Sequence, residues 1–308
     1  MSLDVSALSA YIEDRDFPLI GEIQVSPEMT SGMATVVPGL KGTSNIHYMD
    51  TTVTLQDGAN CTRTPSDTTT FSDKSITVAP VGIYEDLCLE DMRGKWLQIL
   101  MSKGTQEGRE ILPSEVAEIY FNEKAMKLAQ TLDIKDWQGD SAGADFYDGW
   151  IKAIDAGSAV NGNTGAVTVA TGVTASNIIP ILQAMWLAQT EELEQRDDVV
   201  IFLPKAWYDL YIVALINANL YHYVGQDGEA KLFGTDIMLK PTYGLRGSDR
   251  MFMTYPKNLI VGVDGENDGD FSYRIDPVTN KKILVDADFT RGCEVYFDEQ
   301  IVEFTLVP

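Results

Sequence analysis

The clearest pattern of hydrophobic and polar positions lies in residues 113–140. Apolar side chains recur there at helical spacing, with charged side chains between them. The apolar positions are Ala117, Phe121, Ala125, Leu128 and Leu132. Pro113 suits the first turn of a helix, because proline lacks an N–H that would stay unbonded there, and Gly139 suits its end. The pattern predicts a helix of about 20 residues, roughly 30 Å long.

The residues before this helix lack the pattern of a compact domain. Residues 2–14 have the spacing of a short amphipathic helix, but residues 15–38 have no period and contain three prolines. In residues 39–82, alternating strands flank a polar stretch of Thr, Ser and Asp. We expect an arm followed by a long β-hairpin. Because neither has enough apolar residues for a core, each needs another surface to lie on.

The remaining chain alternates between helical and strand patterns. Helices are expected at residues 84–102, 146–154, 176–195 and 205–219. Strands are expected at residues 199–203, 237–239, 251–254, 259–263, 271–275, 283–285, 295–297 and 301–306. We expect the first helix described above to pack on the C-terminal strands, with Phe271, Ile283 and Val285 as its partners. These elements together predict an α+β fold.

Composition excludes several classes of protein. The net charge of -23 argues against a nucleic-acid-binding surface, because phosphate contacts need clustered Lys and Arg. The three cysteines, Cys61, Cys88 and Cys293, are scattered, as is typical of a reducing compartment. The N-terminal residues lack the pattern of a secretory signal, and no apolar run is long enough to span a bilayer. We therefore expect a soluble protein made in a cytoplasm.

The candidate metal ligands in the sequence are its two histidines and one acidic loop. The histidines, His47 and His222, have no second His or Cys at ligand spacing. Residues 264–270 resemble a calcium loop, with acidic residues at alternate positions and Gly269 at the sixth. The twelfth position is Ile275, where a calcium loop has a bidentate Glu, so the sequence favours a solvated turn.

No catalytic or cofactor motif is present in the sequence. It contains neither a nucleophile elbow, nor a Walker loop, nor a dinucleotide-binding glycine motif. The aromatic group of Trp207, Tyr208 and Tyr211 favours core packing over a sugar-binding platform. We therefore predict no catalytic, cofactor-binding or metal-binding residues, no cofactor and no enzymatic activity.

The order of these elements resembles the major capsid proteins of tailed double-stranded DNA viruses, which share the Hong Kong 97-like fold. The resemblance covers nearly the whole chain. The segments that carry it are SITVAP at residues 75–80 entering a helix at 85–95, DWQGD at 136–140, Asp148-Gly149, VVIFLP at 199–204 before the Trp207 helix, PKNLIVGVD at 256–264 and DADFTRG at 286–292.

The resemblance implies a division into domains. Residues 1–38 would be an N-terminal arm and residues 39–82 an extended loop that overlaps a neighbouring subunit. Residues 83–144 and 258–308 would form the peripheral domain, with a spine helix at 113–133. Residues 145–257 would form the axial domain, whose loops near Gly162 and Gly225 point at the symmetry axes.

The resemblance also implies a function. Copies of the chain would assemble into hexamers and pentamers of an icosahedral shell around double-stranded DNA, in the cytoplasm of a bacterial host. Portal, scaffolding and decoration proteins would be further partners, with the scaffold a separate protein if there is one. Acidic character suits a container in which DNA slides. Some members of the family crosslink subunits through a loop lysine, for which Lys41 and Lys74 are candidates by location.

Two other classes of function stay open from the sequence. One is an α+β enzyme with a metal site built from loop carboxylates. The other is a β-rich adhesive or binding module. The arm and the hairpin favour the capsid interpretation, because an isolated enzyme has little reason to keep segments without a core of their own.

Overall fold

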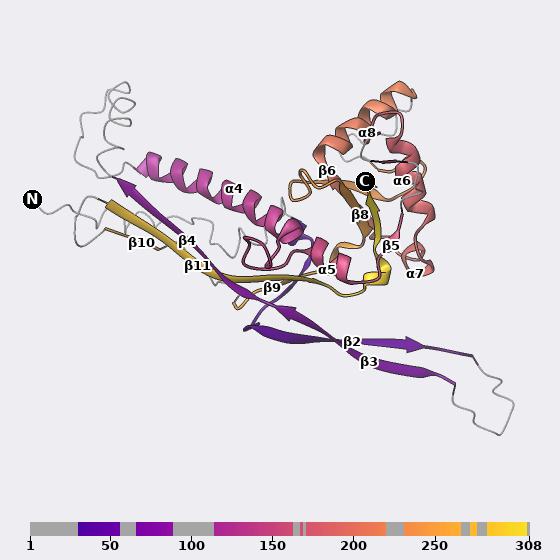
Figure 1. The fold of residues 1–308 in the computed structure, drawn as a ribbon, viewed down its shortest axis with the longest axis horizontal. Helices are drawn as coiled ribbons and strands as arrows, with labels where there is room; N and C mark the ends of the chain where they lie inside the picture. Colours follow the sequence, from indigo (N-terminus) through magenta and orange to yellow (C-terminus); the bar gives the residue numbers. More distant parts are fainter. Residues whose placement is uncertain are drawn as a thin grey trace, which may run out of the picture.

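The computed structural model describes residues 30–55, 66–88, 114–162, 167–168, 171–219, 231–265, 272–275 and 282–306. Within them the chain forms two five-stranded sheets, a long helix and a separate two-stranded hairpin (Figure 1). Short 3-10 helices, at Thr30–Gly32, Pro256–Asn258 and Asp298–Gln300, connect these parts.

The first sheet is built around one long strand, β11 (Lys282–Val295). Its other strands are β1 (Thr35–Val37), β4 (Ala79–Cys88), β9 (Leu259–Gly262) and β10 (Ser272–Ile275). Residues 282–291 of β11 pair antiparallel with β4, and residues 292–295 pair antiparallel with β9. β1 extends the sheet in parallel beside β9. Strand β11 therefore runs the length of this sheet (Figure 1).

The second sheet has the order β5-β12-β8-β6-β7. These strands are β5 (Val160–Asn161), β6 (Val200–Pro204), β7 (Met238–Thr242), β8 (Arg250–Thr254) and β12 (Val302–Thr305). Every residue of β6 is buried, as its unbroken apolar run predicts for a strand covered on both faces.

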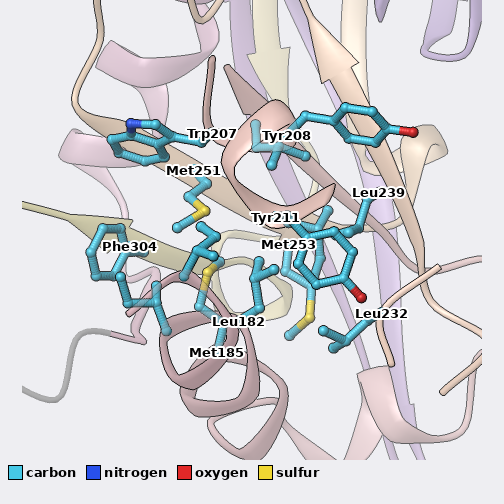
Figure 2. Close-up of a cluster of buried hydrophobic side chains, with 14 of the residues drawn as sticks. Leu182, Met185, Trp207, Tyr208, Tyr211, Leu232, Leu239, Met251, Met253 and Phe304 are labelled. Carbon is cyan, nitrogen blue, oxygen red and sulfur yellow. The ribbon is translucent and has the colours of Figure 1, made fainter. Parts of the chain in front are cut away.

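Helices cover one face of the second sheet. They are α6 (Ile178–Leu187), the short α7 (Glu191–Glu194) and α8 (Lys205–Asn217). Figure 2 shows the side chains that meet there, among them Leu182, Met185, Trp207, Tyr211, Met251, Met253 and Phe304. Trp207, Tyr208 and Tyr211 are all buried in this cluster, so the predicted packing role of the aromatic group is confirmed.

The long helix α4 (Ser114–Gln138) has 25 residues and extends beyond the predicted end of the spine helix at residue 133. It ends one residue before Gly139, as the sequence predicts. Leu128 and Leu132 pack against Ala287 and Phe289 of β11. The prediction that α4 lies on the C-terminal strands is confirmed.

The residues of β11 that form a cluster with α4 differ from the expected ones. Val285 is buried, but the cluster beneath Leu128 contains the next two inward positions of β11, Ala287 and Phe289. Phe271 and the side chain of Ile283 lie outside the described residues.

One predicted element was wrong. Residues 84–88 belong to strand β4, whereas we expected helices at 84–102 and 85–95; residues 89–113 lie outside the described part. The long antiparallel ladder between β4 and β11 overrides the local pattern there, because pairing satisfies the backbone over ten residues on each strand. The strand expected at 283–285 is confirmed, but it is part of the single strand β11, which continues to Val295 and so includes only the first residue of the strand expected at 295–297.

Other predicted boundaries differ by less. The helix expected at 176–195 is divided into α6 and α7, and the one expected at 146–154 is α5 (Trp150–Ala156). The helix predicted at residues 2–14 lies outside the described residues. β12 lies in the second sheet beside β8, although our predicted division assigned residues 258–308 to the peripheral domain.

Candidate functional site

The projecting hairpin is the most distinctive surface of the molecule. β2 (Thr43–Thr52) and β3 (Thr68–Thr77) pair antiparallel, from Thr43 opposite Thr77 to Thr52 opposite Thr68. Its outer part extends away from both sheets (Figure 1). A single two-stranded hairpin is marginally stable in water, so contacts at its base or with another molecule have to support it.

One face of the hairpin is open along its length. It carries the pair His47–Asp73, with 2.6 Å between Nδ1 and Oδ1, and next to it the cross-strand pair Met49 and Phe71. Met49 is 58% exposed and Phe71 77%, and Leu55 near the outer end is 95% exposed. Exposed apolar side chains gathered on one element are typical of an interaction surface.

The opposite face of the hairpin is attached to the body at its base. Lys74 donates to Asp298 at 2.7 Å and lies 3.5 Å from Glu294. Tyr48 contacts Phe297 edge to face, with 5.3 Å between ring centroids. Burial raises the pKa of Glu294 above its ordinary value, while the charge of Lys74 works in the other direction. The ion pairs of Lys74 with Asp298 and Glu294 are partly shielded from water, so they contribute more to stability than an exposed surface pair does.

Backbone hydrogen bonds also hold the base of the hairpin. The N–H groups of Gly39 and Leu40 donate to the carbonyls of Asp264 and Val263, at 2.8 and 3.1 Å. The N–H of Val78 donates to the carbonyl of Gly42 at 2.9 Å. Gly39 and Gly42 have φ angles of 81° and 68°, a region that side-chain-bearing residues rarely adopt. The chain therefore enters the hairpin through a defined double bend.

The C-terminal end of α4 forms a second notable cluster, beneath the first sheet. Arg291 of β11 makes two hydrogen bonds to Asp136, at 2.7 and 2.6 Å, and both side chains are fully buried. Tyr147 donates to the same carboxylate at 2.9 Å. Burial alone would lower the pKa of Arg291, but the charge and hydrogen bonds of Asp136 raise it, so the guanidinium stays charged. This pair fixes α4 to the first sheet.

One turn earlier, Asp133 connects α4 to two other parts of the chain. Its carboxylate accepts the N–H of Thr30 at 3.0 Å and that of Gly244 at 2.5 Å. Burial raises the pKa of Asp133, the nearby Asp136 adds to this effect, and the two backbone donors oppose it. Trp137 donates to the Thr30 hydroxyl at 2.9 Å and stacks on Phe252, with ring centroids 5.4 Å apart.

The end of α4 is thus a joint between the segment at Thr30, the first sheet and the second sheet. Residues 136–140 and 286–292 carry the resemblance to the family, but nothing in the sequence predicts that Asp136 pairs with Arg291. A lone acidic residue on a helix and a lone arginine on a strand carry no signal that they meet, because 155 residues separate them.

The structure describes only part of the candidate metal residues. His47 lies on the open face of the hairpin, and His222 lies outside the described residues. Asp264 lies 3.8 Å from Lys41, and residues 266–270 of the calcium-like turn are not described. Among the described residues, no three His, Cys, Asp or Glu side chains gather as a metal site would require. No helix in that part of the chain is long and apolar enough to cross a membrane.

These parts define an α+β chain with the Hong Kong 97-like fold, in which two sheets share one long helix and a hairpin projects from the first sheet. Matches to solved structures support this assignment of the fold. The capsid of Myoviridae phage XM1 matches with a TM-score of 0.55 and 15% identity over 90% of each chain. The capsid of an empty GTA particle matches with 0.55 and 13% over 100% of each chain.

A satellite phage P4 procapsid that includes the size determination protein Sid matches with a TM-score of 0.55 and 9% identity, over 94% of this chain and 98% of that one. No family model matches the chain, and no curated protein matches its sequence. The fold that the sequence resemblance implied is confirmed by these structures, over most of the chain and at low identity.

Proposed function

We propose that this chain is the major capsid protein of a tailed bacteriophage, which assembles with copies of itself into an icosahedral shell around double-stranded DNA. The observation that carries the proposal is the β2–β3 hairpin. It exposes Met49, Phe71 and Leu55, and it belongs to a chain with the fold of solved phage capsids.

Self-association gives the hairpin the partner it lacks in one chain. Closed symmetry repeats the same modest contact between neighbouring copies, and the repeated contacts together stabilise the assembly. Met49 and Phe71 would be covered by a neighbouring copy, and the segment before Thr30 would lie along neighbouring copies as an arm. Helix α4 would serve as the spine of the peripheral domain, and the second sheet with its helices as the axial domain.

The net charge of -23 agrees with an inner surface along which packaged DNA slides without binding. We place the protein in the shell of the virion, assembled in the host cytoplasm. Portal, scaffolding and decoration proteins are its further proposed partners. No observation on the described residues favours the metal-dependent enzyme or the adhesive module, so neither is proposed.

The hairpin tests this function directly. Wild-type protein purified with a co-expressed scaffold should yield shells in negative-stain images. The double variant M49D/F71D should remain folded and soluble but lose at least 90% of the shells, because two charges cannot be buried against a neighbour without partners. The matched control T51S/T69S changes the next cross-strand pair on the same face and should assemble normally.

Two results would contradict the proposal. The first is that the wild-type chain stays monomeric in every ionic condition, even with scaffold present. The second is that M49D/F71D forms as many shells as the control, which would show that this face of the hairpin does not contact a neighbour.

A further inference from the structure

Two glycines face each other directly beneath the base of the hairpin. Gly262 of β9 and Gly292 of β11 are partners in the antiparallel register. Side chains alternate along β11, so Gly292 and Glu294 lie on the face opposite to Arg291, whose side chain contacts α4. Because neither glycine has a side chain, the pair leaves a patch without side chains, here called the bare patch, on the face of the sheet that the hairpin crosses.

The hairpin uses this bare patch as a contact surface. A Cβ at Gly292 would lie 2.2 Å from the carbonyl oxygen of Thr77 and 3.0 Å from the Cα of Val78. These are backbone atoms at the junction of β3 and β4, and they cannot move aside without moving the hairpin. A Cβ at Gly262 would instead meet side chains, at distances between 2.7 and 2.9 Å, and those side chains belong to Leu40, Ile76 and Val78.

A second attachment point lies three residues along β3. Lys74 holds Asp298 at 2.7 Å and Glu294 at 3.5 Å, and Glu294 is the next residue after Gly292 on the same face of β11. Backbone contact at residues 77–78 and an ion pair at residue 74 together restrain both the position and the tilt of the hairpin.

We infer that Gly292, its partner Gly262 and Lys74 form a seat that sets the direction in which the β2–β3 hairpin leaves the body. In a shell, the direction of the hairpin decides where the neighbouring copy lies, so the seat also sets the curvature of the wall. The inference about curvature rests on the proposed function, and the inference about direction does not.

The expected displacement follows from the geometry. Relief of the contact between a Cβ at residue 292 and the Thr77 oxygen needs a shift of about 1 Å, and Lys74 lies about 10 Å along the strand, which gives a tilt of roughly 5°. Lys74 is the pivot of this tilt, and the outer end of β3 at Thr68 lies six residues, roughly 20 Å, beyond it, so the outer end moves by about 2 Å.

Distances between spin labels measure the direction of the hairpin in the purified protein. One label is placed at the outer end of β2, by Thr52→Cys, and the other on the body at the exposed Leu187, by Leu187→Cys. Cys61 and Cys88 are replaced by Ser, and the buried Cys293 is left in place. Gly292→Ala should shift the mean distance by about 2 Å, or redistribute it if the tilt is sideways. Gly262→Ala should change it less, because only side chains have to repack.

Matched controls separate the seat from a general effect of adding a methyl group. Gly143→Ala, where the nearest atom to a Cβ is at an ordinary 3.4 Å, should leave the distance distribution unchanged. Lys74→Met removes the charge and retains most of the side-chain length, and it should broaden the distribution because one of the two attachment points is lost. If Gly292→Ala does not fold, the label distances in Lys74→Met and Gly262→Ala test the inference instead.

Images of assembled shells supply the second measurement. Gly292→Ala should give shells of altered diameter or open sheets, whereas Gly143→Ala should give shells of wild-type diameter. Unchanged label distances in both Gly292→Ala and Lys74→Met would overturn the inference. If wild-type protein forms no shells, the proposed function fails, and the label distances still decide whether the seat sets the direction of the hairpin.

Discussion

At the scale of single residues, the joint at the end of α4 depends on a buried pair of opposite charges. Asp136 and Arg291 are both removed from water, and each makes two hydrogen bonds to the other. Burial, with the neighbouring charge of Asp136, raises the pKa of both Tyr147 and Cys293, so that both stay protonated around the carboxylate. Removal of either member of the ion pair leaves an uncompensated buried charge.

We therefore expect Arg291→Met to lower the free energy of unfolding by about 3–5 kcal/mol. Urea unfolding monitored by tryptophan fluorescence measures this change. Lys205→Met breaks the exposed pair between Lys205 and Asp209 on α8, and it should cost less than about 1 kcal/mol. Equal effects of the two substitutions would show that the buried pair contributes no more than a surface pair.

Asp133 gives a prediction for the pH dependence of stability. Its folded-state pKa lies above the ordinary value of 3.8, because burial disfavours the charged form. The folded state therefore holds this proton more tightly than the unfolded state. The stability due to this group is fully present below pH 3.8 and is lost as the pH rises through the folded-state pKa.

Unfolding free energies measured over a pH series test this sign. The stability difference between wild type and Asp133→Asn should become less favourable to wild type as the pH rises from about 4. Asp140 is the control, because its pKa is lowered, first by its hydrogen bond to Lys152; the corresponding difference for Asp140→Asn should become less favourable to wild type as the pH falls below about 4, and it should change little above that pH. A difference for Asp133→Asn that does not vary with pH would contradict the assignment.

At the scale of elements, helix α4 packs on the first sheet through apolar side chains on one of its faces. Leu128 and Leu132 are buried on Ala287 and Phe289, while Met126, on the same helix, is 52% exposed. The helix then passes from this packing to the polar joint at Asp133 and Asp136. It thereby connects the far end of the first sheet to the second sheet.

Leu128→Asp should destabilise the fold by about 3 kcal/mol or more, because it removes buried apolar surface and places a carboxylate there. Soluble yield and the midpoint of urea unfolding measure the effect, and shells should be absent. Met126→Asp adds the same charge on the exposed face of α4 and should change the stability little. If Leu128→Asp gave normal shells, the inward face of α4 would be assigned wrongly.

Elements whose signals are local could be predicted from the sequence. The period of residues 113–140 predicts α4, the apolar run at residues 199–203 predicts β6, and the alternation around Tyr48 and Ile76 predicts the hairpin. Strand β4 could not be predicted in full, because residues 84–88 pair with residues 282–286, about 200 positions away.

The length of β11 was missed for a different reason. The sequence predicts a strand only at residues 283–285, and Asp286 and Asp288 follow it. In the structure they lie on the outer face of one continuous strand, while Val285, Ala287 and Phe289 face inward. The same alternation hides Arg291 among the inward positions, so the ion pair of the joint could not be inferred from residue type alone.

At the scale of the whole molecule, the proposed assembly requires a strongly acidic chain to approach copies of itself. With a net charge of -23, neighbouring subunits repel each other at long range. Apolar contacts such as Met49 and Phe71 do not depend on this charge, whereas the repulsion is screened over a Debye length of about 10 Å at 0.1 M salt and about 3 Å at 1 M.

Shell formation should therefore increase with ionic strength. Light scattering at a fixed protein concentration should show a several-fold higher yield of particles at about 0.5 M than at about 0.05 M sodium chloride. A yield that falls steadily with added salt would instead mean that attractive charge pairs between subunits dominate assembly.

The seat beneath the hairpin joins residues that are synthesised early to residues that are synthesised late. Thr77 and Lys74 leave the ribosome early, but Gly262, Gly292 and Asp298 follow roughly 200 residues later, which takes about 10–40 s at bacterial rates of synthesis. Until then the hairpin has no fixed direction relative to a body that does not yet exist. Under the proposed function, chains that stop before this point would not present the hairpin to a neighbour in the assembled geometry, so the order of translation would keep truncated chains out of the shell.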